Sequence, residues 1–177
     1  MPSNGLPNRE VSAMEIVQAT PALAGSLPAL FSAAKKHLRS QGIKQWDFFY
    51  PNSFLIRNDV KKGELYGILE DGRFIAAVTL NTVTPREYEQ ISWTHHRALI
   101  IHRLVVSPDA QGRGIGKHML SFCENFARAH QYDSIHLDAY TDNAAAVSLY
   151  DRNGYQRRGE VRFPMRRHPF ICFEKVL

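Results

Sequence analysis

The chain is 177 residues long, and 44% of its residues are hydrophobic and 22% are charged. This balance is typical of one globular domain, and it excludes wholesale disorder and fibrous repeats. No apolar run approaches the roughly 20 residues of a membrane-spanning helix, so no membrane association is expected. The formal net charge of +5 is too modest and dispersed to indicate nucleic acid, although it suits a small polyanionic ligand.

The first residues, MPSNGLPNRE, lack the basic start and apolar stretch of a secretory signal. We expect residues 1–10 to be a flexible tail and residues 11–177 to form the domain. Cys123 and Cys172 fit neither a disulfide framework nor a zinc site. Cys123 falls within an apolar helical pattern that is typical of a buried free thiol. These features predict a cytoplasmic protein.

The first part of the chain carries one strand signal and two helix signals. Residues 11–18 favour a first strand. A helix is expected next, with Thr20 as its N-cap and Pro21 at its first position. Pro28 within that segment predicts a kink or a split. Ser53 is expected to cap a second, shorter helix.

The remainder of the chain reads as strands separated by helices. Asp71-Gly72 lies between two β-rich runs and predicts a hairpin. The nearly continuous apolar run ALIIHRLVV predicts a central strand. An apolar stripe after the glycines of QGRGIG predicts a helix, and NAAAVSLYDRN predicts another. Strands are expected at SIHLDAY, YQRRGEVRF and FICFEKVL. This order predicts a single-domain α/β fold with a mixed sheet.

The segment Gln111–Gly116, QGRGIG, places three glycines between the central strand and an amphipathic helix. Backbone N–H groups at a helix start bind phosphate, and glycine lets the phosphate come close to them. The segment is not a Walker loop, because Gly-Lys-Ser/Thr is missing. It is not a dinucleotide fingerprint either, whose last glycine would fall at Lys117. By spacing alone, an anion site and a structural turn both stay open.

Two segments in the right order resemble the GNAT superfamily of N-acetyltransferases. LVVSPDAQGRGIGKHML is similar to the family's acyl-coenzyme-A-binding segment, with Gln111, Gly114 and Gly116 at the motif positions. NAAAVSLYDRNGYQ is similar to its second motif. Because the order of elements also fits from residue 11 onward, the resemblance covers nearly the whole chain. It implies a GNAT-like, mostly antiparallel central sheet flanked by helices, with acetyl-CoA as co-substrate and no metal.

The resemblance also implies roles for individual residues. Backbone N–H groups of the glycine loop would hold the coenzyme pyrophosphate. The end of the central strand would pair with the pantetheine arm and polarise the acetyl carbonyl. The implied coenzyme-binding residues are Leu104, Val105, Val106, Gln111, Gly112, Arg113, Gly114, Ile115, Gly116, Lys117 and Asn143. Tyr150 would protonate the leaving thiolate, with simple packing as the alternative.

A proton acceptor is also needed, because an amine attacks only when neutral and its pKa is roughly 10. Some family members carry a catalytic carboxylate at the place of Asp138, which makes it a candidate base. A merely hydrogen-bonded aspartate is the alternative. His102, Glu87, Glu89 and water are further candidates.

The acceptor side of the site is less specified. Trp46 and Tyr50 belong to an aromatic cluster that is typical of core or of a hydrophobic cap over it, and the resemblance implies that they contact the substrate. Glu87 lies in a loop that could face the acceptor. His95 and His96, even with His102, lack accompanying ligands at suitable spacing, so no metal is predicted.

The leading hypothesis is an N-acetyltransferase that transfers acetyl directly from acetyl-CoA to a primary amine in a ternary complex. The amine could belong to a small molecule or to a protein, and no loop carries a specificity code. A non-catalytic acyl-CoA-binding or sensing module is the alternative. A nucleic-acid-binding domain has no supporting motif. Dimers are common in the family, which makes a homodimer a further expectation.

Overall fold

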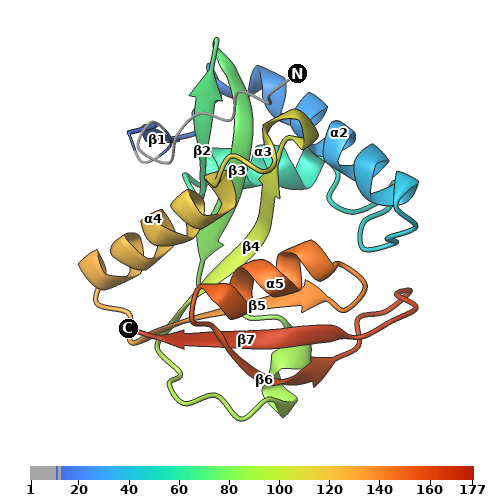
Figure 1. Cartoon of the computed structure of the whole chain (residues 1–177). Helices are drawn as coiled ribbons and strands as arrows, with labels where there is room; N and C mark the ends of the chain where they lie inside the picture. Colours follow the sequence, from blue (N-terminus) through green and yellow to red (C-terminus); the bar gives the residue numbers. More distant parts are fainter. Residues whose placement is uncertain (1–10, 12) are drawn as a thin grey trace.

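The computed structural model describes residue 11 and residues 13–177, so the tail expected over residues 1–10 lies outside the described residues. Within this part of the chain, seven strands form one sheet. Their order across the sheet is β1-β2-β3-β4-β5-β7-β6 (Figure 1). In chain order they are β1 (Ile16–Gln18), β2 (Leu65–Glu70), β3 (Arg73–Asn81), β4 (Ala98–Val106), β5 (Ser134–Tyr140), β6 (Gln156–Val161) and β7 (Phe170–Val176).

Every neighbouring pair of strands is antiparallel except β4 and β5, which run parallel. The predicted α/β class with a mixed, mostly antiparallel sheet is therefore confirmed. The α-helices in the described residues are α2 (Leu27–Ser40), α3 (Ser53–Lys61), α4 (Ile115–Ala129) and α5 (Ala144–Arg152). The short 3₁₀ helices are η1 (Ala24–Ser26), η2 (Arg86–Gln90) and η3 (Pro108–Ala110).

The first helix begins later than the sequence predicts. A 3₁₀ turn, η1, precedes α2, so Thr20 is not the N-cap and Pro21 is not the first helical residue. Pro28 lies in the first turn of α2, where its missing N–H leaves no bond unmade. It therefore does not kink the helix, and the predicted split corresponds to the boundary between η1 and α2 just before Pro28. The strand expected over residues 11–18 is limited to β1.

The start of α3 also differs from the prediction by one residue. Asn52, with extended backbone angles, is the N-cap, and its side chain accepts a hydrogen bond from the N–H of Leu55 over 2.9 Å. Ser53 is instead the first helical residue. Asparagine and serine are both good N-caps, and Asn52 takes this role because its backbone is extended, as an N-cap requires.

The β2–β3 hairpin is confirmed at the predicted place. Asp71 and Gly72 have φ angles of 50° and 74°, as a two-residue type I′ turn requires at both central positions. The central strand β4 is the predicted run ALIIHRLVV without change.

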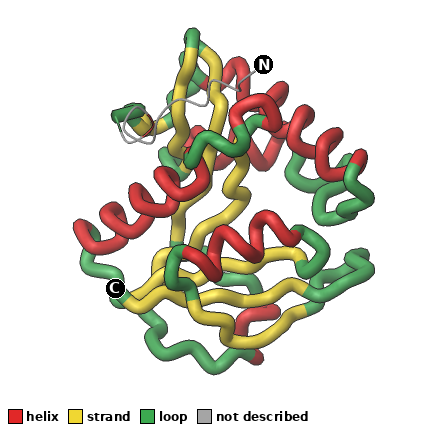
Figure 2. The backbone as a smooth tube through the Cα atoms, viewed as in Figure 1, coloured by secondary structure: helices red, strands yellow, loops and turns green. Residues whose placement is uncertain are grey.

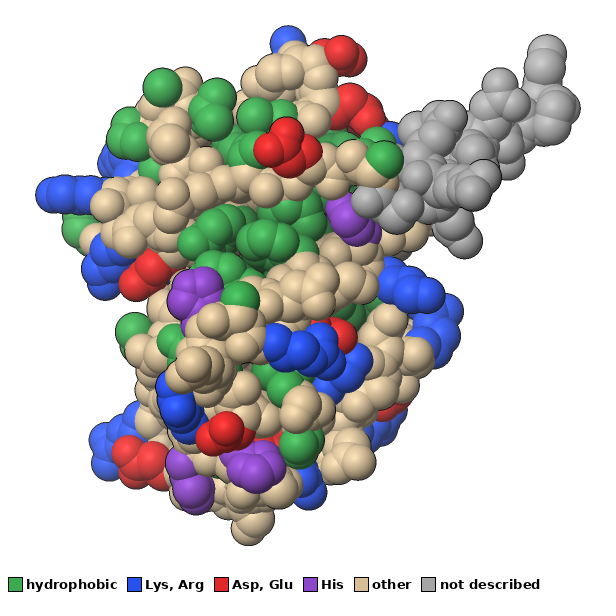
Figure 3. Space-filling view, turned by 90° about the vertical axis from the view of Figure 1, so that its left-hand side faces the viewer, with side chains coloured by type: hydrophobic (Ala, Val, Ile, Leu, Met, Phe, Trp, Pro, Cys, Tyr) green, Lys and Arg blue, Asp and Glu red, His purple; other side chains and the backbone are tan. Residues whose placement is uncertain are grey.

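The helices cover both faces of the sheet (Figure 2). Along β3, Ala76, Val78 and Leu80 belong to the core that also contains the buried face of α4. Phe74 and Ala77 belong to a second core with α2 and α3. A third core lies between η2 and the β5–β7 part of the sheet. Seen from the side of β1 and the C-terminus, basic and acidic side chains adjoin one another around a band of hydrophobic ones (Figure 3).

The sheet opens at its centre. β4 pairs with β5 only where Ala98, Leu99 and Ile100 meet residues 134–136. Beyond that point β4 stays with β3, whereas β5 pairs with β7 along its whole length. The two strands therefore diverge, and among the described strands none pairs with the edge of β4 from Ile101 to Val106 that faces β5 (Figure 1).

Candidate functional site

The glycine segment forms the turn between η3 and α4. Gly112 and Gly114 have φ angles of 77° and 81°, in the left-handed region that favours glycine. Gly114 is the N-cap of α4. Within the described part of the chain, the backbone N–H groups of residues 112–117 donate to no protein acceptor. A run of free N–H groups at the start of a helix fits a pyrophosphate.

A cavity of about 650 Å³ extends from this turn along β4 and α5. Gly116 lets the start of α4 lie close to α5, because a Cβ there would lie 3.1 Å from Cδ2 of Leu149 on α5. Nine of the predicted coenzyme residues line the cavity: Leu104, Val106, Gln111, Gly112, Gly114, Ile115, Gly116, Lys117 and Asn143. The unpaired edge of β4 and the free N–H groups thus share one cavity, which fits an extended ligand with a diphosphate.

The other two predicted coenzyme residues, Val105 and Arg113, do not line this cavity. The Val105 side chain is buried in the core with α2, so only its backbone could serve a ligand. The guanidinium of Arg113 turns to β2, where Nη2 lies 2.8 Å from Oε2 of Glu70. Its Nε is buried without a hydrogen-bond partner among the described residues.

The edge of β4 is shaped by a β-bulge. His102 lies opposite Thr79 and Val105 lies opposite Ala77, so β4 carries one extra residue between them. Arg103 has a φ of 53°, which is strained for a residue with a side chain. Such strain persists only where the surroundings hold the residue in place.

Contacts of the Arg103 side chain supply that restraint. Its Nη2 lies 2.6 Å from Oδ2 of buried Asp59, and its Nη1 donates to the Tyr50 hydroxyl over 3.2 Å. Asp59 Oδ2 also accepts from the Thr79 hydroxyl over 2.9 Å. The bulge is therefore tied to α3 and to the loop before it.

A second cavity, of about 310 Å³, lies on the other side of this edge. Its walls come from β4, β5, β7 and α5, and from the α2–α3, β3–β4 and β6–β7 connections. The predicted residues Trp46, Tyr50, Asp138 and Tyr150 line it, whereas Glu87 does not. The two cavities share the lining residues Leu104, Asn143, Ala146 and Tyr150.

Tyr150 lies at this junction and is 6% exposed. Its ring packs 5.4 Å from the ring of Phe173, while its hydroxyl bonds to no other described residue. Burial raises the pKa of Tyr150, and the neighbouring Asp138 and Cys123 raise it further. The phenol therefore stays protonated at neutral pH and is free to donate into either cavity.

Asp138 on β5 lines the second cavity, the one of about 310 Å³. Its Oδ2 accepts a hydrogen bond from the Tyr88 hydroxyl over 2.7 Å. Burial raises the pKa of Asp138 to about 6, the Tyr88 hydrogen bond opposes this, and the charge of Glu87 adds to it. A carboxylate with this pKa is ionised at neutral pH and is a stronger base than an exposed aspartate.

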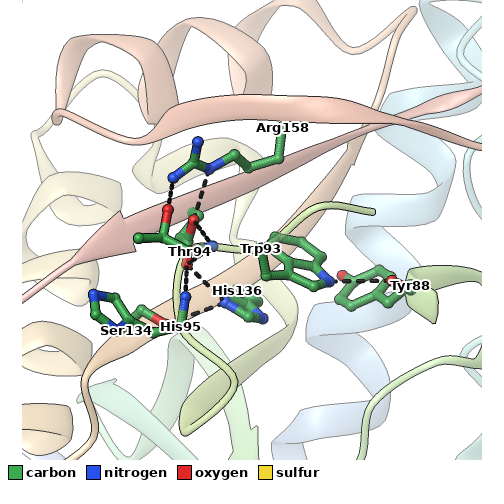
Figure 4. A network of polar contacts seen from close by, with 8 residues as sticks. Tyr88, Trp93, Thr94, His95, Ser134, His136 and Arg158 are labelled. Atoms are coloured by element: carbon green, nitrogen blue, oxygen red, sulfur yellow. Dashed lines mark hydrogen bonds and ion pairs between the residues drawn. The ribbon is translucent and has the colours of Figure 1, made fainter. Parts of the chain in front are cut away.

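Tyr88 is a site residue that the sequence analysis missed. It lies on η2 and is 1% exposed, and its ring lies 5.1 Å from the ring of Trp93. Trp93 Nε1 donates to the Tyr88 carbonyl over 3.1 Å, and the Trp93 ring stacks on His136 at 3.8 Å. Trp93 thus lies between Tyr88 and His136 (Figure 4).

The loop that carries Trp93 is held by buried Glu174 of β7. Its carboxylate accepts from the backbone N–H groups of Thr94 and His95 over 3.0 to 3.1 Å, and from Arg158 Nε over 2.6 Å. His136 Nε2 lies 3.2 Å from Oε1 (Figure 4). Burial opposes ionisation of Glu174, but these hydrogen bonds outweigh it and lower its pKa to about 2. The network fixes the loop and, through Trp93, the position of Tyr88.

The other base candidates are placed less favourably. His102 lines the second cavity, but its Nε2 lies 2.8 Å from Oδ1 of Asn81. Burial and the charge of Arg103 lower the pKa of His102 to about 4, which makes it a weak base. Glu87 is half-buried beside Asp138, and Glu89 is exposed.

Asn143 lines both cavities, and its side chain makes two hydrogen bonds within the protein. Its Oδ1 caps α5 by accepting from the N–H of Ala146 over 3.1 Å. Its Nδ2 donates to Oε1 of Gln45 over 2.8 Å. The side chain therefore ties α5 to the α2–α3 loop at the place where the cavities meet, and its polar groups are already used inside the protein.

The matching family model is the acetyltransferase (GNAT) family, over residues 29–155. The chain is 29% identical over 141 residues to the uncharacterized N-acetyltransferase YesJ of Bacillus subtilis, covering 77% of this chain and 78% of that one. It is 38% identical over 80 residues to the N-alpha-acetyltransferase RimI of Mycobacterium tuberculosis, covering 45% and 42% of the two chains.

Solved structures share the fold. A GNAT-family acetyltransferase from Streptococcus agalactiae matches with a TM-score of 0.80 and 24% identity, over 93% of this chain and 95% of that one. The PaiA N-acetyltransferase of Thermoplasma acidophilum, solved with coenzyme A, matches with a TM-score of 0.68 and 17% identity, over 93% and 99%.

The fold, the glycine cradle formed by the free N–H groups of residues 112–117, and these relatives define the class of protein as an acetyl-CoA-dependent acetyltransferase. The chain belongs to the acetyltransferase (GNAT) family, whose model it matches over most of its length. Among the residues that the structure describes, no helix is both long and apolar enough to cross a membrane.

Proposed function

We propose that this protein transfers the acetyl group of acetyl-CoA directly to a primary amine while both substrates are bound. One observation carries the proposal: the cavity with free N–H groups and the cavity with Asp138 meet at Tyr150. A donor bound in the first cavity and an amine bound in the second would have their reacting ends at this junction. Such positioning makes direct transfer favourable.

On the coenzyme side, the N–H groups of residues 112–117 bind the pyrophosphate, and the free edge of β4 pairs with the pantetheine arm. Acetyl-CoA supplies an activated acetyl group on a thioester. A backbone N–H near the bulge at Arg103 donates to the acetyl carbonyl and stabilises the negative charge that develops on its oxygen. The side chain of Asn143 orients α5 beside the arm.

On the amine side, Asp138 accepts a proton from the acceptor, either directly or through water. The neutral nitrogen then attacks the carbonyl carbon, a C–N bond forms and the C–S bond breaks. Tyr150 donates its proton to the leaving sulfur, and the second proton that the nitrogen loses on becoming an amide returns to the Tyr150 oxygen through water. Trp46 and Tyr50 wall the acceptor cavity, and Glu87 acts on it only through Asp138.

The alternative of a binding module without turnover explains less. A module that only binds acyl-CoA needs the glycine cradle, but it has no need for a second cavity. Asp138, whose pKa is raised, and Tyr150, whose hydroxyl is free, line that second cavity together. Groups with shifted pKa values that converge in a cavity support catalysis.

Calorimetric titration with acetyl-CoA tests the coenzyme half of the proposal, with dephospho-coenzyme A and NAD as comparisons. We expect micromolar binding that prefers acetyl-CoA. Release of free thiol in the presence of a panel of primary amines then tests transfer. A folded protein that binds no acetyl-CoA would contradict the proposed function. Binding without thiol release from any amine would favour the sensing module.

A cytoplasmic location and a homodimer stay predictions of the sequence, as does the extent of the domain over residues 11–177. Size-exclusion chromatography with light scattering tests the homodimer directly, since a dimer doubles the 20.2 kDa mass of the chain.

A further inference from the structure

The second cavity, which we assign to the acceptor, is lined by more positively than negatively charged side chains. Three of its lining residues carry a charge at neutral pH: Arg103, Asp138 and Arg166. Asp138 is the single carboxylate among the lining residues in the described part of the chain. Glu87 lies close enough to Asp138 to raise its pKa, but it does not line the cavity.

Both guanidinium groups are held by carboxylates that do not line the cavity. Arg103 pairs with Asp59 at 2.6 Å, and Arg166 Nη1 pairs with Oδ2 of Asp47 at 2.7 Å. Neither aspartate lines the cavity. A ligand in the cavity therefore meets the cationic member of each pair, and one carboxylate.

The other lining residues are both apolar and polar. Aromatic and aliphatic walls come from Trp46, Pro85, Ile101, Phe163, Pro164 and Phe170, and uncharged polar groups come from Gln45, Tyr50, His102, Asn143 and Tyr150. At about 310 Å³ the cavity lies near the lower end of the roughly 300–1,000 Å³ of small-molecule sites. It suits the body of one compact apolar molecule. A chain with several ammonium groups would have a single lining carboxylate, Asp138, for all of its charges.

We propose that the acceptor is a compact primary amine with an apolar body and a single positive charge, and that polyamines are excluded; this rests on the proposed acetyl transfer at the same site. The reacting ammonium meets Asp138, while the carbon body lies against the aromatic walls. A second ammonium finds no further carboxylate on the lining and faces Arg166 instead, with which it interacts unfavourably.

A matched pair of substrates tests this without any mutation. Pentylamine and cadaverine have the same carbon chain and differ by one terminal ammonium. We expect kcat/KM for pentylamine to exceed that for cadaverine by at least about tenfold. A ratio below about tenfold overturns the proposal, and it does so without touching acetyl transfer itself. If acetyl-CoA does not bind, or no amine releases thiol, it is the proposed function that fails.

A charge reversal at the cavity wall provides the second test. Arg166→Glu replaces the guanidinium by a carboxylate, and we expect it to lower the pentylamine preference by at least about fivefold. Arg167→Glu, at the exposed neighbouring position, makes the same change in net charge and is expected to leave the ratio unchanged. Equal ratios in the wild type and a folded Arg166→Glu protein overturn the role of Arg166. Should Arg166→Glu not fold, Arg166→Gln keeps the comparison, with a smaller expected change in the same direction.

Discussion

Replacing Tyr88 with phenylalanine removes one hydrogen bond from the proposed base and keeps the ring. The Tyr88 hydroxyl donates to Asp138 Oδ2 over 2.7 Å, and its ring packs 5.1 Å from the ring of Trp93. Phenylalanine preserves that packing. Because the lost donor stabilises the ionised form of Asp138, the pKa of the carboxyl rises in the variant.

The size of the change follows from the hydrogen bond itself. A hydrogen bond to a charged group contributes about 1.5–3 kcal/mol, and one pKa unit corresponds to about 1.4 kcal/mol. The pKa of Asp138, which is about 6 in the wild type, should therefore be about one to two pKa units higher in the variant. The other groups around Asp138 are Glu87, Tyr150 and Cys172, and none of them changes in the variant.

The assay is kcat/KM as a function of pH, between about pH 5 and pH 9. Because Asp138 must be ionised to accept a proton, activity falls below its pKa, and the acid limb moves to higher pH in Tyr88→Phe. Tyr132→Phe is the matched control, since the Tyr132 hydroxyl bonds to no described residue. An acid limb that stays in place in a folded Tyr88→Phe protein would show that Asp138 is not the base.

Three further substitutions test other parts of the site. Tyr150→Phe should reduce kcat by about a hundredfold or more with unchanged acetyl-CoA affinity; equal turnover would mean that Tyr150 only packs. Gly114→Glu should abolish acetyl-CoA binding in calorimetry, whereas Gly72→Glu, with a similar φ of 74°, should not; unchanged affinity would refute the cradle. Glu174→Gln should lower the free energy of unfolding at pH 7 by about 3 kcal/mol, from a pKa of about 2 against an ordinary 4.5. That stabilisation is present above about pH 4.5 and is lost as the pH falls through about 2, so urea titrations of the two proteins should converge in acid.

Elements set by neighbouring residues were predictable from the sequence. The turn at Asp71 and Gly72 needs only two residues that accept positive φ, and β4 needs only a continuous apolar run. The start of α2 was not predictable in this way. Pro21 and Pro28 both suit a first helical turn, and the choice depends on tertiary packing: Leu27, the first residue of α2, is fully buried in the core with α3.

The candidate site also has a part that local sequence predicts and a part that it does not. The glycine cradle is one contiguous segment, so its residue types and spacing are visible in the sequence. Tyr88 and Asp138 are 50 residues apart, and no local pattern predicts that they meet. Arg166 is similar, because its partner Asp47 lies 119 residues away. Glu87 was predicted as a site residue from its charge. The hydrogen bond to Asp138 is made instead by the hydroxyl of Tyr88, its neighbour in the sequence.

The opening of the sheet and the position of the site have one physical origin. β4 cannot stay paired with both neighbours, because its extra residue near Arg103 bends it while β5 follows β7. The strain at Arg103 is sustained by its ion pair with Asp59, a residue that lines neither cavity. The pair therefore maintains the free edge of β4 to which we assign the coenzyme arm in the proposed function, and the junction of the two cavities lies beside the bulge. This explains why a buried ion pair and a strained arginine occur in the middle of an otherwise regular central strand.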